Sequence, residues 1–169
     1  MSVNINLPRI LRVGAGASDH LASTLKHLGL SRPLLVTDPF MRECGYADRV
    51  VSGLDAAGIA HGVFAECVPD PTTDSVGQGL AALAASSYDC LVALGGGSSI
   101  DTAKAVAAMA DRDGPMRDYK VPHLIDTGLP VIAIPTTAGT GSEATHAAVI
   151  TDSETSEKML CSGLGLMPI

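Results

Sequence analysis

Runs of apolar residues alternate along the chain with segments in which apolar side chains recur every three or four positions. Such alternation is typical of βαβ units, in which helices join buried parallel strands. The expected strands cover residues 9–13, 33–36, 59–64, 90–94, 131–134 and 147–151. The expected helices cover residues 18–28, 50–57, 76–83 and 98–110, and the first two end at Gly29 and Gly58.

The order of these elements predicts an α/β fold with three layers and a mostly parallel sheet, because parallel strands need helical crossovers. We expect one domain over residues 1–169, with a long polar surface connection at residues 111–128. Ligands of such sheets bind beyond the carboxyl ends of the strands. The candidate functional loops are therefore those that follow Val36, Phe64, Leu94 and Ile134.

Composition narrows the class of protein further. The chain has 169 residues, of which 46% are hydrophobic, 17% charged and 3% aromatic, which suits one domain with an aliphatic core. A formal net charge of −7 disfavours binding to nucleic acid or to an anionic membrane. No apolar run approaches the roughly 20 residues of a membrane span, and no signal peptide is visible. We therefore expect a cytoplasmic protein.

The four cysteines are far apart in the sequence and form no CxxC motif. The sequence alone allows a disulfide, but in a reducing cytoplasm we expect free and mostly buried thiols. They are Cys44, Cys67, Cys90 and Cys161.

A glycine-rich loop, residues 95–99 (Gly-Gly-Gly-Ser-Ser), joins the clearest expected strand to a helix. Glycines let a backbone approach a ligand closely, and the free amides at a helix start attract phosphate. A tight turn without a ligand needs one or two glycines, so three in a row favour phosphate binding. The loop is neither a GxGxxG nor a GK[ST] motif.

Two carboxylates near the expected strand ends have alternative interpretations. Asp38 ends the second strand, where it could bind the hydroxyls of an adenosine ribose or only form an Asp-Pro turn. Asp101 lies one turn inside the helix after the glycine loop, where it could accept from a ribose hydroxyl. It could equally form a surface ion pair with Lys104, three residues later.

The loop over residues 135–143 is rich in hydroxyl groups. Neutral donors suit a phosphate, a ribose or a carboxamide, and Thr140 with Glu143 also has the spacing of a capping box. The donors are Thr136, Thr137, Thr140 and Ser142.

Other motifs are less informative. Residues 14–18 look like a dinucleotide loop but favour a plain turn after an edge-like strand. The serines lie in no GxSxG elbow, and the five histidines have no metal-ligand spacing. His146 is close in sequence to the hydroxyl-rich loop, but we expect it to be solvated.

With these loops placed, the chain resembles the amino-terminal domain of the iron-containing (group III, metal-dependent) alcohol dehydrogenases. The two most specific segments are residues 95–104 (GGGSSIDTAK) and 135–145 (PTTAGTGSEAT), in this order. Residues 37–41, 69–72 and 149–152 and Lys158 also fit the family pattern.

The resemblance implies a Rossmann-like, NAD(P)-binding domain of the dehydroquinate synthase type. It implies that Gly96, Gly97 and Ser98 contact the pyrophosphate, and that Asp38 contacts the adenosine ribose and favours NAD over NADP. Asp101 and Asp70 match positions near the nicotinamide side and the cofactor loop. The implied cofactor-binding residues are Asp38, Asp70, Gly96, Gly97, Ser98, Asp101, Thr136, Thr137, Thr140, Val149 and Lys158.

Family members continue into a helical domain whose Asp and three His hold Fe²⁺ or Zn²⁺. None of these ligands is present here, so the sequence assigns no catalytic and no metal-binding residue. The chain looks like a truncated cofactor half, inactive alone. We expect the intact protein to be a homodimer that transfers a hydride between an alcohol or aldehyde and nicotinamide.

Three rival functions remain at this stage. A glycerol dehydrogenase or maleylacetate reductase would share these loops. A non-catalytic NAD-sensing module would need no metal ligands. A lipid or nucleotide-sugar kinase could use a glycine triplet after a strand, and would bind ATP with Mg²⁺.

Overall fold

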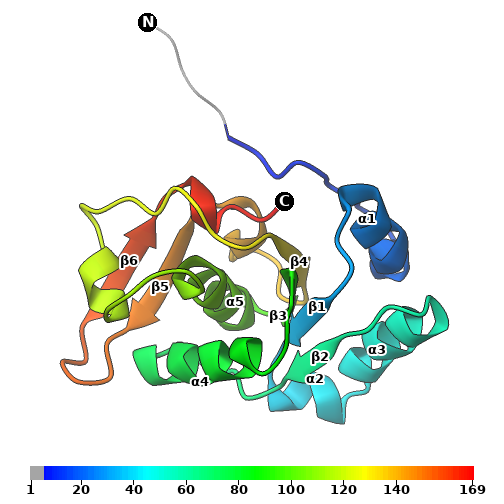
Figure 1. Ribbon diagram of the computed structural model, residues 1–169, viewed down its shortest axis with the longest axis horizontal. Coiled ribbons are helices and arrows are strands. Elements are labelled where there is room, and N and C mark those ends of the chain that lie inside the picture. Colours follow the sequence, from blue (N-terminus) through cyan, green and yellow to red (C-terminus); the bar gives the residue numbers. More distant parts are fainter. Residues whose placement is uncertain (1–5) are drawn as a thin grey trace, which may run out of the picture.

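A four-stranded parallel sheet, in the order β2-β1-β3-β4, forms the centre of the computed structural model, which describes residues 6–169 (Figure 1). A separate antiparallel hairpin, β5–β6, lies beside it. The strands are β1 Pro33–Val36, β2 Gly62–Phe64, β3 Cys90–Gly95, β4 Val131–Pro135, β5 Ala147–Thr151 and β6 Lys158–Ser162. The α-helices are α1 Leu21–Leu28, α2 Pro39–Glu43, α3 Tyr46–Ala56, α4 Thr73–Ala84 and α5 Gly97–Met109.

Alternate residues of the central strands face opposite layers. Leu35 and Val92 pack with buried residues of α1, α2 and α3 on one face. Leu34 and Leu91 pack with α4 and α5 on the other. All four of these strand residues are 0–1% exposed. Because each central strand is covered on both faces, it reads in the sequence as an unbroken apolar run.

Helix α5 is surrounded by other elements. Its far side packs against the inner face of the hairpin, and one hydrophobic cluster includes Val106 of α5 together with Ile150 and Met159 of the hairpin. The hairpin thus lies beyond the helical layer (Figure 1). This explains why apolar or small residues occupy nearly every position of α5 rather than one stripe.

The three-layer, mostly parallel architecture is confirmed, and so are the strands expected at residues 33–36, 90–94, 131–134 and 147–151. The strand expected at residues 9–13 is wrong. Val13 is 95% exposed, and without a neighbouring strand an isolated extended segment gains little from burial. The strand expected at residues 59–64 is shorter, since β2 begins only at Gly62.

The starts of two helices differ from the expected ranges because of local capping and turns. Asp38 accepts a hydrogen bond from the Met41 N–H at 3.0 Å, so α2 begins where we expected only a turn. The helix expected from residue 18 begins only at Leu21, because a 3-10 turn, Ala17–His20, precedes α1 and is itself preceded by Gly16. Residues 14–18 form the plain turn that we predicted. Gly29, with φ 73°, ends α1 as expected.

The connection at residues 111–128 is irregular as predicted, but it is not only a surface segment. It contains the 3-10 helix η2, Met116–Tyr119, and buries Met116 and Ile125. The N–H groups of Val121 and Ile125 donate to Leu160 and Ser162 along the outer edge of β6. The connection therefore covers an edge that would otherwise be unpaired.

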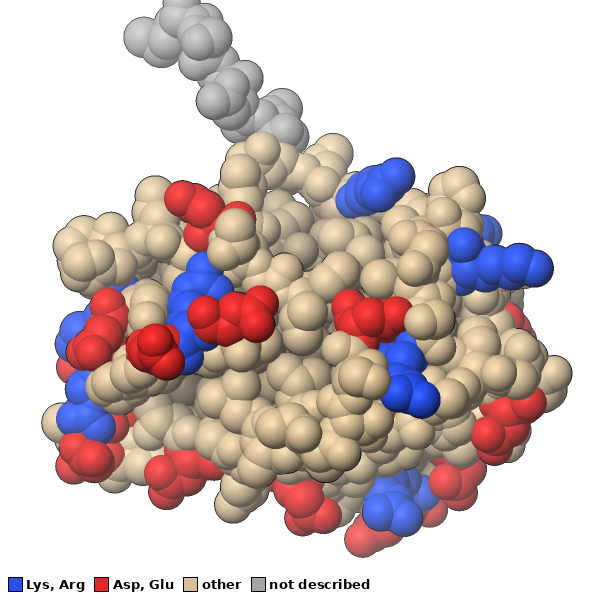
Figure 2. Space-filling view, in the orientation of Figure 1, with Lys and Arg blue, Asp and Glu red and all other residues tan. Residues whose placement is uncertain are grey.

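Within residues 6–169, no helix has the length and apolar character needed to cross a membrane. On the face drawn in Figure 2, acidic and basic side chains are interspersed among neutral ones and form no broad basic patch.

The cysteines are free, and three of them are buried, as expected. Burial raises the pKa of Cys67 to about 12 and that of Cys161 to about 11. Burial also raises the pKa of Cys90. Only Cys44 is exposed.

We predict that a disulfide reagent at pH 8 modifies one thiol rapidly in the folded protein, because the thiolate is the reactive species and buried thiols are both inaccessible and protonated. Titration with Ellman's reagent should give one equivalent before unfolding and four in urea. The Cys44→Ser variant should give none before unfolding. A second fast equivalent in the folded protein would contradict the burial described above.

Candidate functional site

The carboxyl ends of the four parallel strands lie at one edge of the sheet, as the sequence predicted. Hydrogen bonds connect the loops that leave them. Thr37 donates from its N–H to the Phe64 carbonyl and from Oγ1 to the Leu94 carbonyl at 2.8 Å. The Thr136 N–H donates to the Gly95 carbonyl. All four candidate loops are therefore held side by side.

Of the three consecutive glycines, only Gly95 has a backbone conformation that favours glycine. Its φ of +149° is a conformation that L side chains rarely adopt. A Cβ there would lie 2.4 Å from Ser99 Oγ and 3.0 Å from Asp38 Oδ2. Gly95 thus brings the end of β3 close to Asp38 and lets the chain turn into α5.

Gly96 and Gly97 lie close to side chains of the hydroxyl-rich loop instead. A Cβ on Gly96 would lie 3.1 Å from Thr137 Oγ1, and one on Gly97 would lie 3.2 Å from Ser142 Oγ and 3.3 Å from Thr140 Cβ. The structure thus brings the glycine loop against the hydroxyl-rich loop. Part of the glycine signal therefore reflects contact between two loops and not a ligand.

The start of α5 provides donors at this junction. Gly96 precedes the helix and no side chain caps it, so the first N–H groups, from Gly97 onward, have no partner within the helix. Gly96, Gly97 and Ser98 are all partly exposed. Such amides, with the positive end of the helix dipole, favour an anion.

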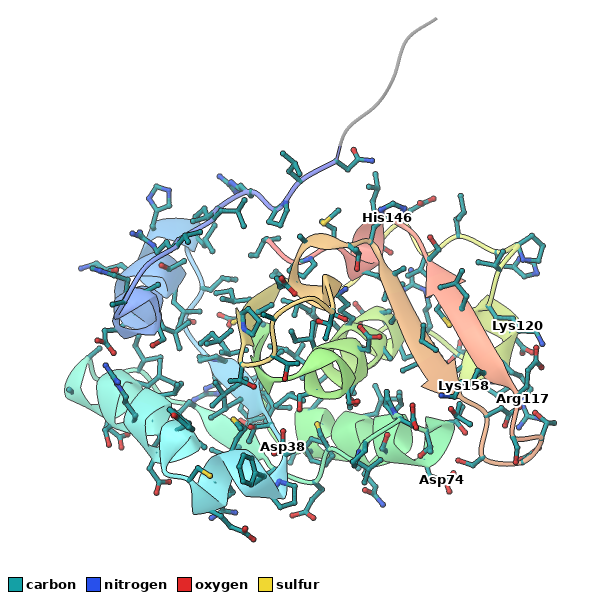
Figure 3. All side chains as sticks on the ribbon, turned by 180° about the vertical axis from the view of Figure 1, so that it is seen from behind. Asp38, Asp74, Arg117, Lys120, His146 and Lys158 are labelled. Atoms are coloured by element: carbon teal, nitrogen blue, oxygen red, sulfur yellow. The ribbon has the colours of Figure 1, made fainter. Side chains whose placement is uncertain are left out.

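Asp38 lies directly beside this helix start (Figure 3). Its Oδ1 accepts from Met41 N–H and its Oδ2 accepts from Ser99 Oγ, each at 3.0 Å. The capping role and a ribose-binding role are compatible, because an ionised carboxylate has about four lone-pair sites. Sequence reasoning missed Ser99, although its place two residues into α5 could have indicated a contact with a strand-end carboxylate.

Asp101 and Lys104 do not form the surface ion pair considered above. Lys104 is 0% exposed, and its Nζ lies 4.0 Å from Asp101 Oδ1. Nζ donates instead to the carbonyls of Thr145 and Ala147, at 2.8 and 2.9 Å. Burial lowers the pKa of Lys104 to about 8, and burial raises the pKa of Asp101. Tertiary packing outweighs the usual preference of lysine for solvent.

Asp101 contacts β5. Its Oδ2 accepts from the Val149 N–H at 3.0 Å, while its Oδ1 is buried with no hydrogen-bond donor among the described residues. Val149 leaves its side chain 43% exposed on the outer face of the hairpin. Asp101 therefore fixes the position of one predicted cofactor residue, and its own contact with a cofactor stays a prediction.

Asp70 and Lys158 pair with each other at the hairpin. Lys158 Nζ donates to Asp70 Oδ1 at 2.9 Å, and both side chains are exposed. Asp70 has φ 50°, which fixes the sharp turn before α4. Lys158 lies apart from Asp38 in the view of Figure 3.

The capping box that the spacing of Thr140 and Glu143 allowed does not form. Gly141, with φ 71°, precedes the short 3-10 helix Ser142–Ala144, and no side chain caps it. The capping box occurs instead between Thr72 and Ser75 at α4. Thr136, Thr137 and Thr140 remain exposed, and so does the predicted solvated histidine, His146.

The residues at this edge suit a dinucleotide better than a metal ion. Free helix amides beside a carboxylate and neutral hydroxyls match a pyrophosphate next to a ribose. Among residues 6–169, no group of three or more His, Cys, Asp or Glu side chains could hold a metal ion.

The fold is a Rossmann-like α/β domain, and the comparisons identify its family. A family model described as iron-containing alcohol dehydrogenase matches residues 8–169. The chain belongs to this family. The NAD-dependent methanol dehydrogenase of Bacillus methanolicus is 39% identical over 157 residues, which are 92% of this chain and 41% of that protein.

Solved structures agree with this assignment. A 1,3-propanediol oxidoreductase superposes with a TM-score of 0.93 at 31% identity, over 99% of this chain and 44% of that one. The sulfoacetaldehyde reductase of Bifidobacterium kashiwanohense, solved in complex with NAD⁺, gives a TM-score of 0.90 at 30% identity, over 99% and 45%. The chain thus spans about 40% of the length of the curated relatives that it matches.

We predict that Gly95→Ala lowers the free energy of unfolding by about 2 kcal/mol or more, because a non-glycine residue in this conformation costs about 1–3 kcal/mol before any steric conflict with Ser99. Urea unfolding monitored by circular dichroism measures the loss. Gly77→Ala is the matched control, since Gly77 lies in the exposed interior of α4 with open space around it. Equal unfolding midpoints for both variants would contradict the strain at Gly95.

Proposed function

We propose that this chain is the cofactor-binding half of an NAD-dependent, metal-dependent alcohol dehydrogenase. The observation that supports it most directly is the junction of the uncapped α5 start, Asp38 and the hydroxyl-rich loop at one edge of a parallel sheet. Residues 1–169 would form one dinucleotide-binding domain. NAD, when bound, supplies a nicotinamide ring that accepts or donates a hydride.

Each group at this edge has a proposed role. The amides of Gly96, Gly97 and Ser98 would bind the pyrophosphate, and Asp38 would accept from the adenosine ribose hydroxyls. The hydroxyls of Thr136, Thr137 and Thr140 would donate to phosphate, ribose or carboxamide oxygens. Val149 would offer an apolar surface, with Asp101 behind it. Lys158 and Asp70 would close the side of the cleft that the hairpin forms.

The reaction of the whole protein is proposed from its relatives, whose names specify methanol in one case and sulfoacetaldehyde in another. We propose a small alcohol or aldehyde as substrate, with Fe²⁺ or Zn²⁺ held outside this chain. The chain alone would then bind cofactor but not catalyse hydride transfer. A homodimeric state and a cytoplasmic location stay predictions.

We predict that the 169-residue chain binds NADH saturably but weakly, because part of the cleft would come from outside it. Titration of NADH fluorescence with protein at up to millimolar concentration measures the affinity, and ATP with Mg²⁺ serves as the competing ligand. Tight ATP–Mg²⁺ binding without an NADH signal would indicate a kinase and overturn the proposal. Alcohol-dependent NADH formation by the chain alone would show that the catalytic groups lie within it.

We predict that Asp38 makes the chain prefer NAD over NADP. A carboxylate near 4 Å from the 2′-phosphate costs about 1–4 kcal/mol at a partly solvated site, which is a preference of roughly ten- to several-hundred-fold. Asp38→Gly should improve NADP binding and weaken NAD binding. Asp38→Asn is the control for capping, because Asn keeps the N-cap and removes only the charge.

Both reduced coenzymes would be titrated into the native chain and the two variants. Asp74→Asn removes an exposed carboxylate on α4 and should leave the NAD to NADP ratio unchanged. An unchanged ratio in both Asp38 variants would leave Asp38 with its capping role alone.

A further inference from the structure

The turn of the hairpin, residues 152–157, ends directly before Lys158, and Asp152 organises it. The Asp152 side chain is buried, and its Oδ1 accepts from the Glu154 N–H at 3.0 Å. Its own N–H donates to the Glu157 carbonyl, and its carbonyl accepts from the Ser156 N–H, both at 2.8 Å. The course of the chain into Lys158 therefore depends on how the Asp152 carboxylate is held.

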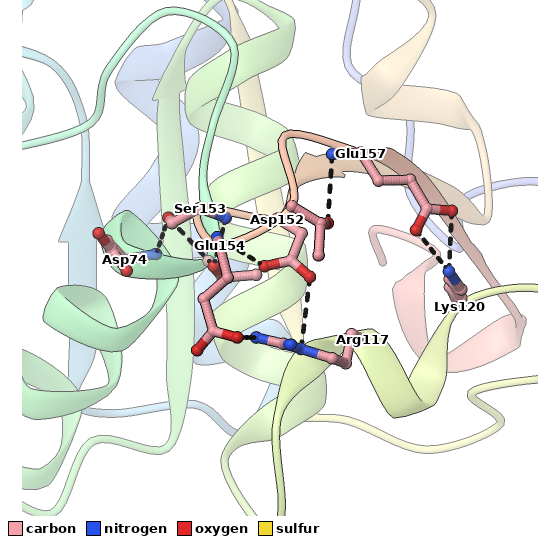
Figure 4. Close-up of polar contacts among 9 residues, drawn as sticks. Asp74, Arg117, Lys120, Asp152, Ser153, Glu154 and Glu157 are labelled. Atoms are coloured by element: carbon pink, nitrogen blue, oxygen red, sulfur yellow. Dashed lines mark hydrogen bonds and ion pairs between the residues drawn. The ribbon is translucent and has the colours of Figure 1, made fainter.

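Arg117 of η2 holds this carboxylate from outside the hairpin (Figure 4). Its Nε lies 3.3 Å from Asp152 Oδ2, and its terminal nitrogen lies 2.6 Å from Glu154 Oε2. One guanidinium thus joins two carboxylates of the turn. A carboxylate that is 1% exposed needs such a partner, since an unpaired buried charge is costly.

The opposite side of the turn is attached to the segment that contains Asp70. Ser153 Oγ accepts from the Asp74 N–H at 3.2 Å, and the Ser153 N–H donates to Thr73 Oγ1 at 3.0 Å. The Thr151 N–H donates to the Pro71 carbonyl at 2.8 Å. The turn is therefore held between α4 and η2, and this sets the distance across which Lys158 reaches Asp70.

We propose that Arg117, acting through Asp152, is a positioning residue that holds Lys158 at the cofactor cleft. The proposal rests on the proposed function, in which Lys158 contacts the cofactor. Arg117 itself contacts no proposed cofactor residue, so any effect on the cofactor must pass through the turn. Lys158 keeps its ammonium exposed, which lets it exchange Asp70 for a cofactor oxygen.

The test is NADH affinity of the 169-residue chain, measured for the native protein and for Arg117→Ala. We expect the dissociation constant to rise about three- to tenfold. A misplaced Lys158 would lose part of the free energy of one charge-assisted hydrogen bond to the cofactor. Lys120→Ala is the matched control. Lys120 lies beside η2 and pairs with Glu157 of the same turn at 2.6 Å, but this pair is exposed. It should leave the dissociation constant unchanged.

A double-mutant cycle separates positioning from general destabilisation. In a Lys158→Ala background, Arg117→Ala should have no further effect on NADH affinity, since the residue that it positions is gone. A loss of affinity that persists in this background would overturn the proposal. If Arg117→Ala is too unstable to titrate, Arg117→Lys replaces it, because Lys keeps the charge but cannot bridge both carboxylates.

The outcomes are distinguishable. If the native chain binds NADH and Arg117→Ala binds it equally well, this inference is wrong and the proposed function stands. If the native chain does not bind NADH, the proposed function is wrong and the inference is overturned with it. Thermal unfolding of each variant, read by circular dichroism, confirms that the titrated proteins are folded.

Discussion

The burial of the Lys104 ammonium is the interaction on which the candidate site depends. Helix α5 lies between the parallel sheet and the hairpin, so a long side chain on it has no route to solvent. Lys104 is the largest fully buried side chain among the described residues. Burying an ammonium without hydrogen-bond acceptors would cost much free energy, so acceptors must lie within hydrogen-bond distance of it. The carbonyls of Thr145 and Ala147 do so, and they fix the segment between the hydroxyl-rich loop and β5 and the start of β5.

The first two turns of α5 organise three different segments. Ser99 donates to Asp38 just after β1, and Asp101 accepts from Val149 in β5. Lys104 donates to the carbonyls of Thr145 and Ala147. The same helix start leaves its amides free. A substitution in this stretch therefore alters several loops together, and its effects will not add simply to those of its neighbours.

The features predicted most accurately from the sequence were the buried strands and the helix ends that follow local backbone rules. The short apolar runs at residues 33–36 and 90–94 indicated interior strands, and Gly29 marked a helix end. The antiparallel strand β6 was missed, because its buried and exposed positions alternate but its residue types do not: the outward-facing Leu160 is as apolar as the buried Met159 and Cys161. The burial of Lys104 could not be predicted either, since it depends on the hairpin that covers α5.

The contacts of the candidate site residues follow the same division. Contacts at the strand ends, such as those near Gly95 and Asp38, lie where the parallel topology puts them. Contacts that depend on the hairpin, such as those of Lys158, need tertiary structure. A two-stranded hairpin is marginal on its own, so its position must come from its attachments. Here α5 holds its inner face, while Arg117 and Ser153 hold its turn. The part of the proposed cleft that the sequence describes least well is therefore the part held by side chains from distant segments.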